Sequence, residues 1–131
     1  MASNGAKIVL AARKEEELKR LKPSICDAGG DAVYYVTDVT KKEQVAAMVD
    51  YALQQYGQID VLINNAGTMP GSFLYKNNTE EWDQLIDVNI KGVLYGIGAV
   101  LPHMRERKTG HIINVSSTAA HESVLPGVTV Y

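Results

Sequence analysis

The sequence has 131 residues, of which 46% are hydrophobic and 21% charged, the size and balance of one globular domain. A formal net charge of -2 gives no bulk electrostatic reason to bind nucleic acid or an anionic membrane, so neither partner is expected. The single cysteine, Cys26, excludes an internal disulfide and a cysteine-based zinc site.

No uninterrupted apolar run reaches the roughly 20 residues that cross a bilayer, and the opening "MASNGAKIVLAAR" has no signal-peptide pattern. The histidines, His103, His111 and His121, lack the spacing and the acidic neighbours of a metal site, so no metal is expected. Together with the single cysteine, these features predict a soluble cytoplasmic protein.

Short apolar runs rich in β-branched residues alternate along the chain with stretches of helical periodicity. Thr40 and Glu43 have the spacing of a capping box before the second helix, which Gly57 is expected to end. The third helix is also expected to begin with a cap, at Thr79. The expected elements are, in order, a strand at 7–12, a helix at 15–21, a strand at 32–36, a helix up to Gly57, a strand at 59–64, a helix from 79 to about 107 and a strand at 110–116.

Strands with continuous apolar runs, joined through helices, predict parallel pairing and burial on both faces. The expected fold class is therefore α/β, a doubly wound parallel sheet of Rossmann type, in one partial domain over residues 1–131. The first strand of such a sheet lies centrally and feeds a glycine-rich turn that binds pyrophosphate. No such turn occurs, because "GIG" at 96–98 falls within a predicted helix. We therefore expect an incomplete sheet. Its first strand is missing from the middle, which leaves two halves, and the strands after Tyr131 are missing as well.

Polar residues follow the third and fourth predicted strands, at the edge where open α/β sheets bind ligands. "INNAG" at 63–67 ends the third strand, and Ser116 and Ser117 end the fourth, although both places are also compatible with ordinary turns. Asn89 shares a helix face with the apolar Leu85. Its amide must therefore find a partner inside the protein, which could be a backbone group, a water or a functional site.

The segments "GAKIVLAAR", "TDVT", "NNAG", "VNIKG" and "INVSS", followed by a tyrosine, stand in an order and spacing typical of one family. Over essentially all of its residues the chain resembles the short-chain dehydrogenase/reductase family. The resemblance implies hydride transfer between a nicotinamide cofactor and a small carbonyl or alcohol substrate. It also implies a homo-oligomer when the enzyme is complete, and it leaves the identity of the substrate open.

The resemblance assigns roles to individual residues. Ser117 corresponds to the catalytic serine, with Ser116 fitting the spacing less well, and Tyr131 corresponds to the general acid and base. The ordinary pKa of tyrosine, about 10, must be lowered for that role, and the lysine that does so in the family would come one helical turn after Tyr131. Asn89 corresponds to an asparagine that holds a proton-relay water. The implied cofactor positions are Asn64, Ala66 and Gly67 beside the cofactor, and Asp38 and Val39 at the adenine.

The residues after the first strand bear on the choice of cofactor. A site selective for NAD needs a carboxylate there for the ribose 2′-hydroxyl, whereas a 2′-phosphate needs a cation. Ala12 stands where the acid would be, and Arg13, assisted by Lys14, can bind a phosphate. The sequence therefore favours NADP over NAD, although a solvated basic turn would have the same residues.

The missing glycine-rich turn and lysine predict that the chain is the middle of a longer reductase and is inactive alone. Two other interpretations remain open. One is a non-catalytic protein that binds a nucleotide or a partner. The other is a structural subunit that pairs through its sheet edges and the helix that carries Trp82.

Overall fold

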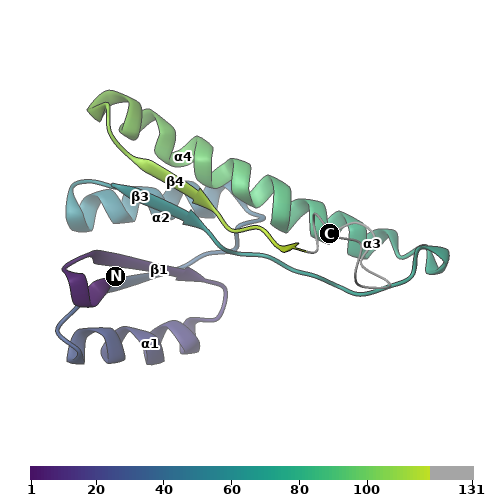
Figure 1. Ribbon diagram of the computed structural model, residues 1–131, viewed down its shortest axis with the longest axis horizontal. Coiled ribbons are helices and arrows are strands. Elements are labelled where there is room, and N and C mark those ends of the chain that lie inside the picture. The colour runs from purple at the N-terminus through teal and green to yellow at the C-terminus, as the bar shows by residue number, and fades with distance from the viewer. Residues whose placement is uncertain (119–131) are drawn as a thin grey trace.

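The computed structural model describes residues 1–118, and the predicted catalytic Tyr131 lies outside them. Helices and parallel strands alternate in the predicted order (Figure 1). The main elements are β1 (Lys7–Ala12), α1 (Glu15–Asp27), β2 (Asp31–Val36), α2 (Lys42–Tyr56), β3 (Val61–Asn64), α3 (Thr79–Leu85), η3 (Ile86–Lys91), α4 (Gly92–Arg107) and β4 (His111–Asn114). Two short 3-10 turns, η1 (Ala2–Asn4) and η2 (Leu74–Lys76), complete the described elements.

The strands form two separate parallel pairs in residues 1–118. β1 pairs with β2 in the register Lys7 to Asp31, and β3 pairs with β4 in the register Val61 to His111. No hydrogen bonds join β1 to β3 within that range, so each pair is its own two-stranded sheet. The predicted parallel pairing is confirmed, and so is the prediction of two halves with no central strand between them.

The helix α2 joins the two sheets. It contacts β1 and β2 and also packs against α4, which covers β3. Val49 of α2 and Val100 and Met104 of α4 form the buried centre of this contact. Because α2 contacts both halves, it fixes the position of one sheet relative to the other, although their strands are not hydrogen-bonded to each other.

The helix ends show which local signals were correct. Gly57 ends α2 with a left-handed φ of 76°, and its N–H donates to Leu53, as a glycine C-cap should. The predicted capping box is wrong, because the Thr40 hydroxyl donates to Asp38 at 2.8 Å and no side chain caps α2. The predicted cap at Thr79 is also wrong, since Thr79 is already the first residue of α3 and no side-chain cap bond is formed.

The third predicted helix is continuous from Thr79 to Arg107, but its middle segment, η3, is π-helical. The helix has 29 residues and a mean hydropathy of 1.4 in its most apolar stretch, so by length and composition it could cross a membrane. In the structure, 22% of that stretch is buried. Core helices of soluble proteins share these properties, and this one helix is therefore weak evidence for a membrane span. Its contacts with β3 and α2 place it within the α/β fold.

The prediction that the third and fourth strands are buried on both faces is wrong for residues 1–118. Val61 and Ile63 of β3 are 47% and 39% exposed, and Ile113 of β4 is 45% exposed. The physical reason is the incomplete sheet. β3 has β4 on one side only, and α4 is the described helix that packs most closely on it.

Candidate functional site

The carboxyl ends of the four strands carry most of the predicted site residues. β1 and β3 point the same way in Figure 1, and the register shows that each strand is parallel to its partner. The residues at these ends are Arg13 after β1, Asp38 and Val39 after β2, Asn64, Ala66 and Gly67 at and after β3, and Ser116 and Ser117 after β4. The fold therefore places predicted cofactor and substrate residues at the ends where parallel sheets bind ligands.

Asn89 holds the loop that follows β3. Its Oδ1 accepts a hydrogen bond from the N–H of Thr68, and its Nδ2 donates to the carbonyl of Thr68, both at 2.9 Å. Asn89 lies in the π-helical segment η3, where the extra residue per turn changes the direction in which side chains point. The inward-facing amide thus has a backbone partner, and it fixes the loop immediately after "NNAG".

Asn64 links the carboxyl ends of β3 and β4. Its Nδ2 donates to Oδ1 of Asn114 at 2.8 Å. Gly96 of α4 allows this arrangement, because a Cβ at that position would lie 2.5 Å from Oδ1 of Asn64. A Cβ at Gly67 would make only an ordinary van der Waals contact, at 3.6 Å from Oδ1 of Asn89. The first glycine of "GIG", Gly96, therefore serves helix-to-strand packing, whereas Gly98 has open space where a Cβ would be.

Asp38 is held as a carboxylate at the end of β2. The backbone N–H and the hydroxyl of Thr40 donate to its Oδ1 at 3.0 and 2.8 Å. The backbone hydrogen bond is the main cause that lowers the pKa of Asp38, and the charge of Arg13 contributes, while partial burial opposes the shift. The neighbouring Val39 packs on Gly92 of α4, where a Cβ would approach Val39 Cγ2 to 2.9 Å.

The two cations after β1 differ in their surroundings. Lys14 Nζ forms an ion pair with Glu17 Oε1 at 3.0 Å, in the first turn of α1. Arg13 is exposed and forms no ion pair within residues 1–118. Of these two cations, Arg13 is therefore the one that is available to bind an added anion.

The two candidate serines also differ. Ser117 is half-buried and Ser116 is exposed, both in the segment after β4. Thr68 and Asn114 were missed by sequence reasoning, although both belong to the same edge. "NNAGT" could have suggested Thr68 because it directly follows the quoted loop, and Asn114 could have been found because it occupies the last strand position.

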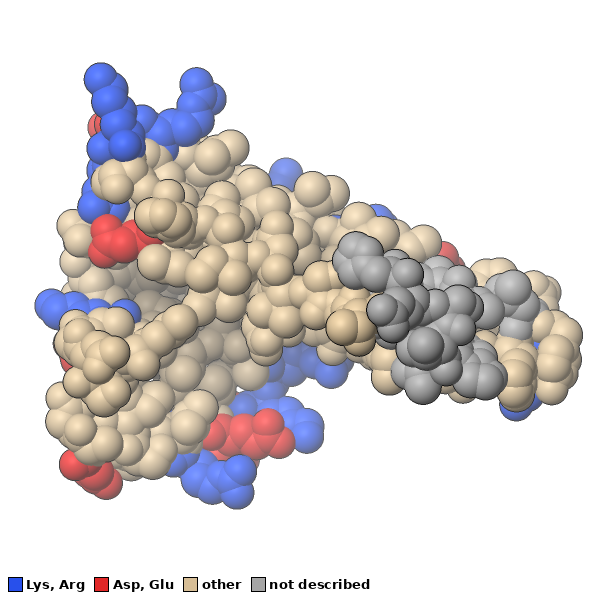
Figure 2. Space-filling view, viewed as in Figure 1, with Lys and Arg blue, Asp and Glu red and all other residues tan. Residues whose placement is uncertain are grey.

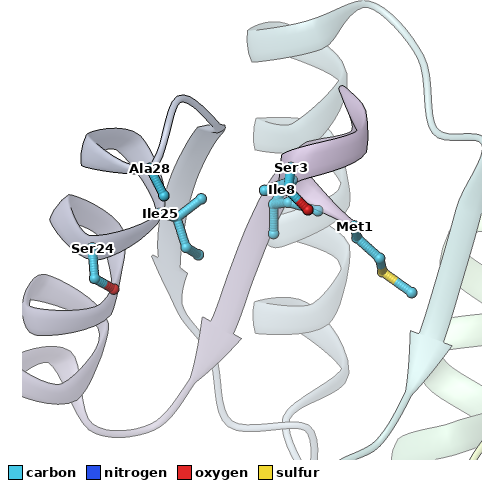
Figure 3. A pocket seen from close by; sticks show the side chains of 7 residues that line it. Met1, Ser3, Ile8, Ser24, Ile25 and Ala28 are labelled. Carbon is cyan, nitrogen blue, oxygen red and sulfur yellow. The ribbon is translucent and has the colours of Figure 1, made fainter.

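An open hollow of about 420 Å³ lies away from this edge. It is formed by the N-terminal turn, the beginning of β1 and the end of α1, including Met1, Ile8 and Ile25 (Figure 3). These residues lie at the amino end of β1, opposite the candidate site. In residues 1–118 no cluster of three or more His, Cys, Asp or Glu side chains could hold a metal ion.

A family model described as short chain dehydrogenase matches residues 1–131. An uncharacterized oxidoreductase of Staphylococcus saprophyticus is 55% identical over the whole chain, which covers 52% of that protein. An uncharacterized oxidoreductase of Listeria innocua is 47% identical, again over the whole chain and 52% of the relative. The chain belongs to the short-chain dehydrogenase family.

Solved structures agree with this membership. A gluconate 5-dehydrogenase from Burkholderia cenocepacia, in complex with NADP and tartrate, is 35% identical with a TM-score of 0.90 and matches 99% of this chain and 51% of its own. A short chain dehydrogenase/reductase from Burkholderia phymatum, in complex with NAD, is 34% identical with a TM-score of 0.92 and matches 99% and 46%. The fold is therefore an incomplete Rossmann-like sheet, and the chain spans about half the length of the relatives it matches.

Proposed function

We propose that this chain supplies cofactor-binding and catalytic residues of an NADP(H)-dependent oxidoreductase that acts on a carbonyl or alcohol substrate. The observation that carries the proposal is the gathering of Arg13, Asp38 and Asn64 at one set of strand ends, next to the loop that Asn89 fixes. Family membership supports a nicotinamide cofactor, since the solved relatives include complexes with NADP and with NAD.

The preference for NADP rests on Arg13. A guanidinium can bind a 2′-phosphate with two parallel hydrogen bonds, and Arg13 has no carboxylate partner in the described chain. Asp38 lies near enough for the charge of Arg13 to lower its pKa, but the two form no ion pair, and Thr40 donates two hydrogen bonds to Oδ1 of Asp38. Ala12 precedes Arg13 and offers no acid for a ribose 2′-hydroxyl.

The proposed catalytic groups follow β4. The hydroxyl of Ser117 donates a hydrogen bond to the substrate oxygen, and the phenol of Tyr131 exchanges a proton with it. Asn89 spends one N–H and one oxygen lone pair on Thr68, so its amide keeps one further N–H and one lone pair for a relay water. The bound nicotinamide would supply or accept the hydride.

Two further parts of the proposal concern the state of the protein. The exposed apolar side chains Ile86, Ile90 and Leu94 recur every fourth residue along the long helix, which supports self-association into a homo-oligomer. The single cysteine, Cys26, supports a cytoplasmic location, because it leaves no internal disulfide to form. The chain alone is proposed to be inactive, because no residue of 1–118 forms a central strand between the two sheets.

The test uses a composite protein in which this chain replaces the matching segment of the Staphylococcus saprophyticus oxidoreductase. NADPH and NADH affinities are measured by titration calorimetry for the composite and for Arg13→Ala. A charge-assisted hydrogen-bonded pair contributes about 1.5–3 kcal/mol to binding. Its loss should raise the Kd for NADPH roughly 10- to 100-fold and leave the Kd for NADH nearly unchanged.

Lys14→Ala is the matched control, since Lys14 is paired with Glu17 and should change the NADPH Kd by much less. An unchanged NADPH affinity in Arg13→Ala would overturn the NADP preference. Tight nucleotide binding without turnover on any of a panel of sugars, steroids, acyl thioesters and small aldehydes would favour the non-catalytic binding protein.

A further inference from the structure

Charge is unevenly distributed along the carboxyl ends of the strands. Residues 61–75, which form β3 and the loop after it, include no charged residue, and neither do residues 112–118 in β4 and the segment after it. Figure 2 shows charged atoms around the turn between β1 and α1, whereas the surface over the carboxyl end of β4 is tan. The segments after β1 and β2 carry side chains of both signs, among them Arg13, Lys14, Asp38 and Lys41.

The two neutral segments leave the sheet side by side. The N–H of Val115 donates to the carbonyl of Asn64 at 3.0 Å, so the segments after β3 and β4 start in contact. Both then run in the same direction, away from the strands (Figure 1). Ser117 belongs to the second segment, and Asn89 fixes the first at Thr68. The proposed substrate position next to Ser117 is therefore bordered by uncharged residues of both segments.

The loop after β3 also exposes large apolar side chains. Met69, Phe73 and Tyr75 are all exposed, although they lie close together in sequence. The rings of Phe73 and Tyr75 are stacked, with their centroids 5.5 Å apart and their planes at 11°. Ser72 is buried, so the loop is anchored directly before Phe73. The stacked pair thus presents a flat apolar surface of the kind that binds another ring.

We propose that the substrate is a neutral carbonyl compound with an aromatic ring, and that Phe73 contributes to its recognition. This inference rests on the proposed function, because it names the substrate class of that oxidoreductase. A carboxylate or phosphate placed between the neutral segments would lose its water without gaining an ion pair from them. An aromatic ring would instead bury apolar area and stack on Phe73.

The test measures ketone binding to the composite protein saturated with NADP⁺. Because the oxidised cofactor carries no hydride to donate, a ketone binds in this complex without being reduced. The probes are 4-acetylbenzamide and 4-acetylbenzoate, which have nearly the same shape and differ in charge at pH 7. Titration calorimetry should give a Kd for the amide that is lower than that for the benzoate by about tenfold or more.

Substitutions at Phe73 test the contact with the ring. Phe73→Ala should raise the Kd for 4-acetylbenzamide by roughly fivefold or more, whereas Phe73→Tyr keeps the ring and should stay within about twofold of the wild type. Leu21→Ala is the matched control, since Leu21 is 47% exposed, as Phe73 is, but lies on α1. None of these variants should change the Kd for NADP⁺.

Equal or tighter binding of the benzoate would overturn the neutral substrate class. Equal effects of Phe73→Ala and Leu21→Ala would overturn the role of Phe73. A changed oligomeric state in Phe73→Ala, measured by light scattering, with an unchanged ketone Kd would overturn it in favour of a subunit interface. If neither ketone binds, the substrate class is wrong, and turnover of another kind of carbonyl compound would leave the proposed function standing. Absence of NADP⁺ binding would contradict both proposals.

Discussion

Replacing Gly96 by alanine tests the contact that positions Asn64. A Cβ on Gly96 would lie 2.5 Å from Oδ1 of Asn64 and 3.4 Å from Cδ2 of Leu62, so α4 or the asparagine must move. Such overpacking costs about 1–3 kcal/mol. Alanine also favours a helix over glycine by about 1 kcal/mol. Gly98→Ala isolates that gain, because no atom lies within 4 Å of its Cβ and it stands in the same helix.

The propensity gain is common to both variants and cancels, so Gly98→Ala should be more stable than Gly96→Ala by about 1–3 kcal/mol. Urea unfolding of the composite protein, followed by circular dichroism, measures the difference. With a urea dependence of about 2 kcal/mol per molar, the midpoints should differ by roughly 0.5–1.5 M. Equal midpoints, or a more stable Gly96→Ala, would refute the close approach of α4 to Asn64.

Two further predictions concern the carboxyl ends of the strands. Asn89→Asp loses the donor to the Thr68 carbonyl and places a carboxylate against it, so unfolding free energy should fall by about 1–3 kcal/mol at pH 7. Protonation of the introduced carboxyl restores a donor to the Thr68 carbonyl while its other oxygen still accepts from the Thr68 N–H, so stability should return as the pH falls toward about 4, whereas Asn89→Ala should show no return. If both variants lose stability by an amount that does not depend on pH, the hydrogen bonds assigned between Asn89 and Thr68 are contradicted. Asp38 has a lowered folded-state pKa through its bonds with Thr40, so its contribution to stability is present above pH ~4 and is lost as the pH falls through the folded-state value. Thermal unfolding should therefore show that acid lowers the melting temperature less in Asp38→Asn than in the wild type. An equal lowering in both proteins would count against the interaction of Asp38 with Thr40.

Much of the fold could be predicted because its signals are local. The apolar run of β1 was predicted with its observed bounds, and the glycine that ends α2 was predicted from its position after the last periodic residue. The division into two sheets could also be predicted, since the strand order of a doubly wound sheet places the missing strand between β1 and β3.

What could not be predicted depended on competing partners. Thr40 had the spacing of a capping residue, but its hydroxyl donates to the carboxylate of Asp38 and no side chain caps α2. Periodicity indicated that the amide of Asn89 points inward, yet the identity of its partner, Thr68, depends on the π-helical turn and on a loop 21 residues away in sequence. The burial of β3 was overestimated because apolar content shows what a strand can bury and not whether a neighbour is present.

The most direct test of the central claim is the rate of NADPH oxidation by the composite protein with a carbonyl substrate found by screening. We predict that Ser117→Ala and Tyr131→Phe each lower kcat at least 100-fold, because a positioned proton donor contributes about 10²–10⁴-fold, while the Kd for NADPH changes little. Turnover at the wild-type rate in Tyr131→Phe would contradict the assignment of this chain as the catalytic part of an oxidoreductase.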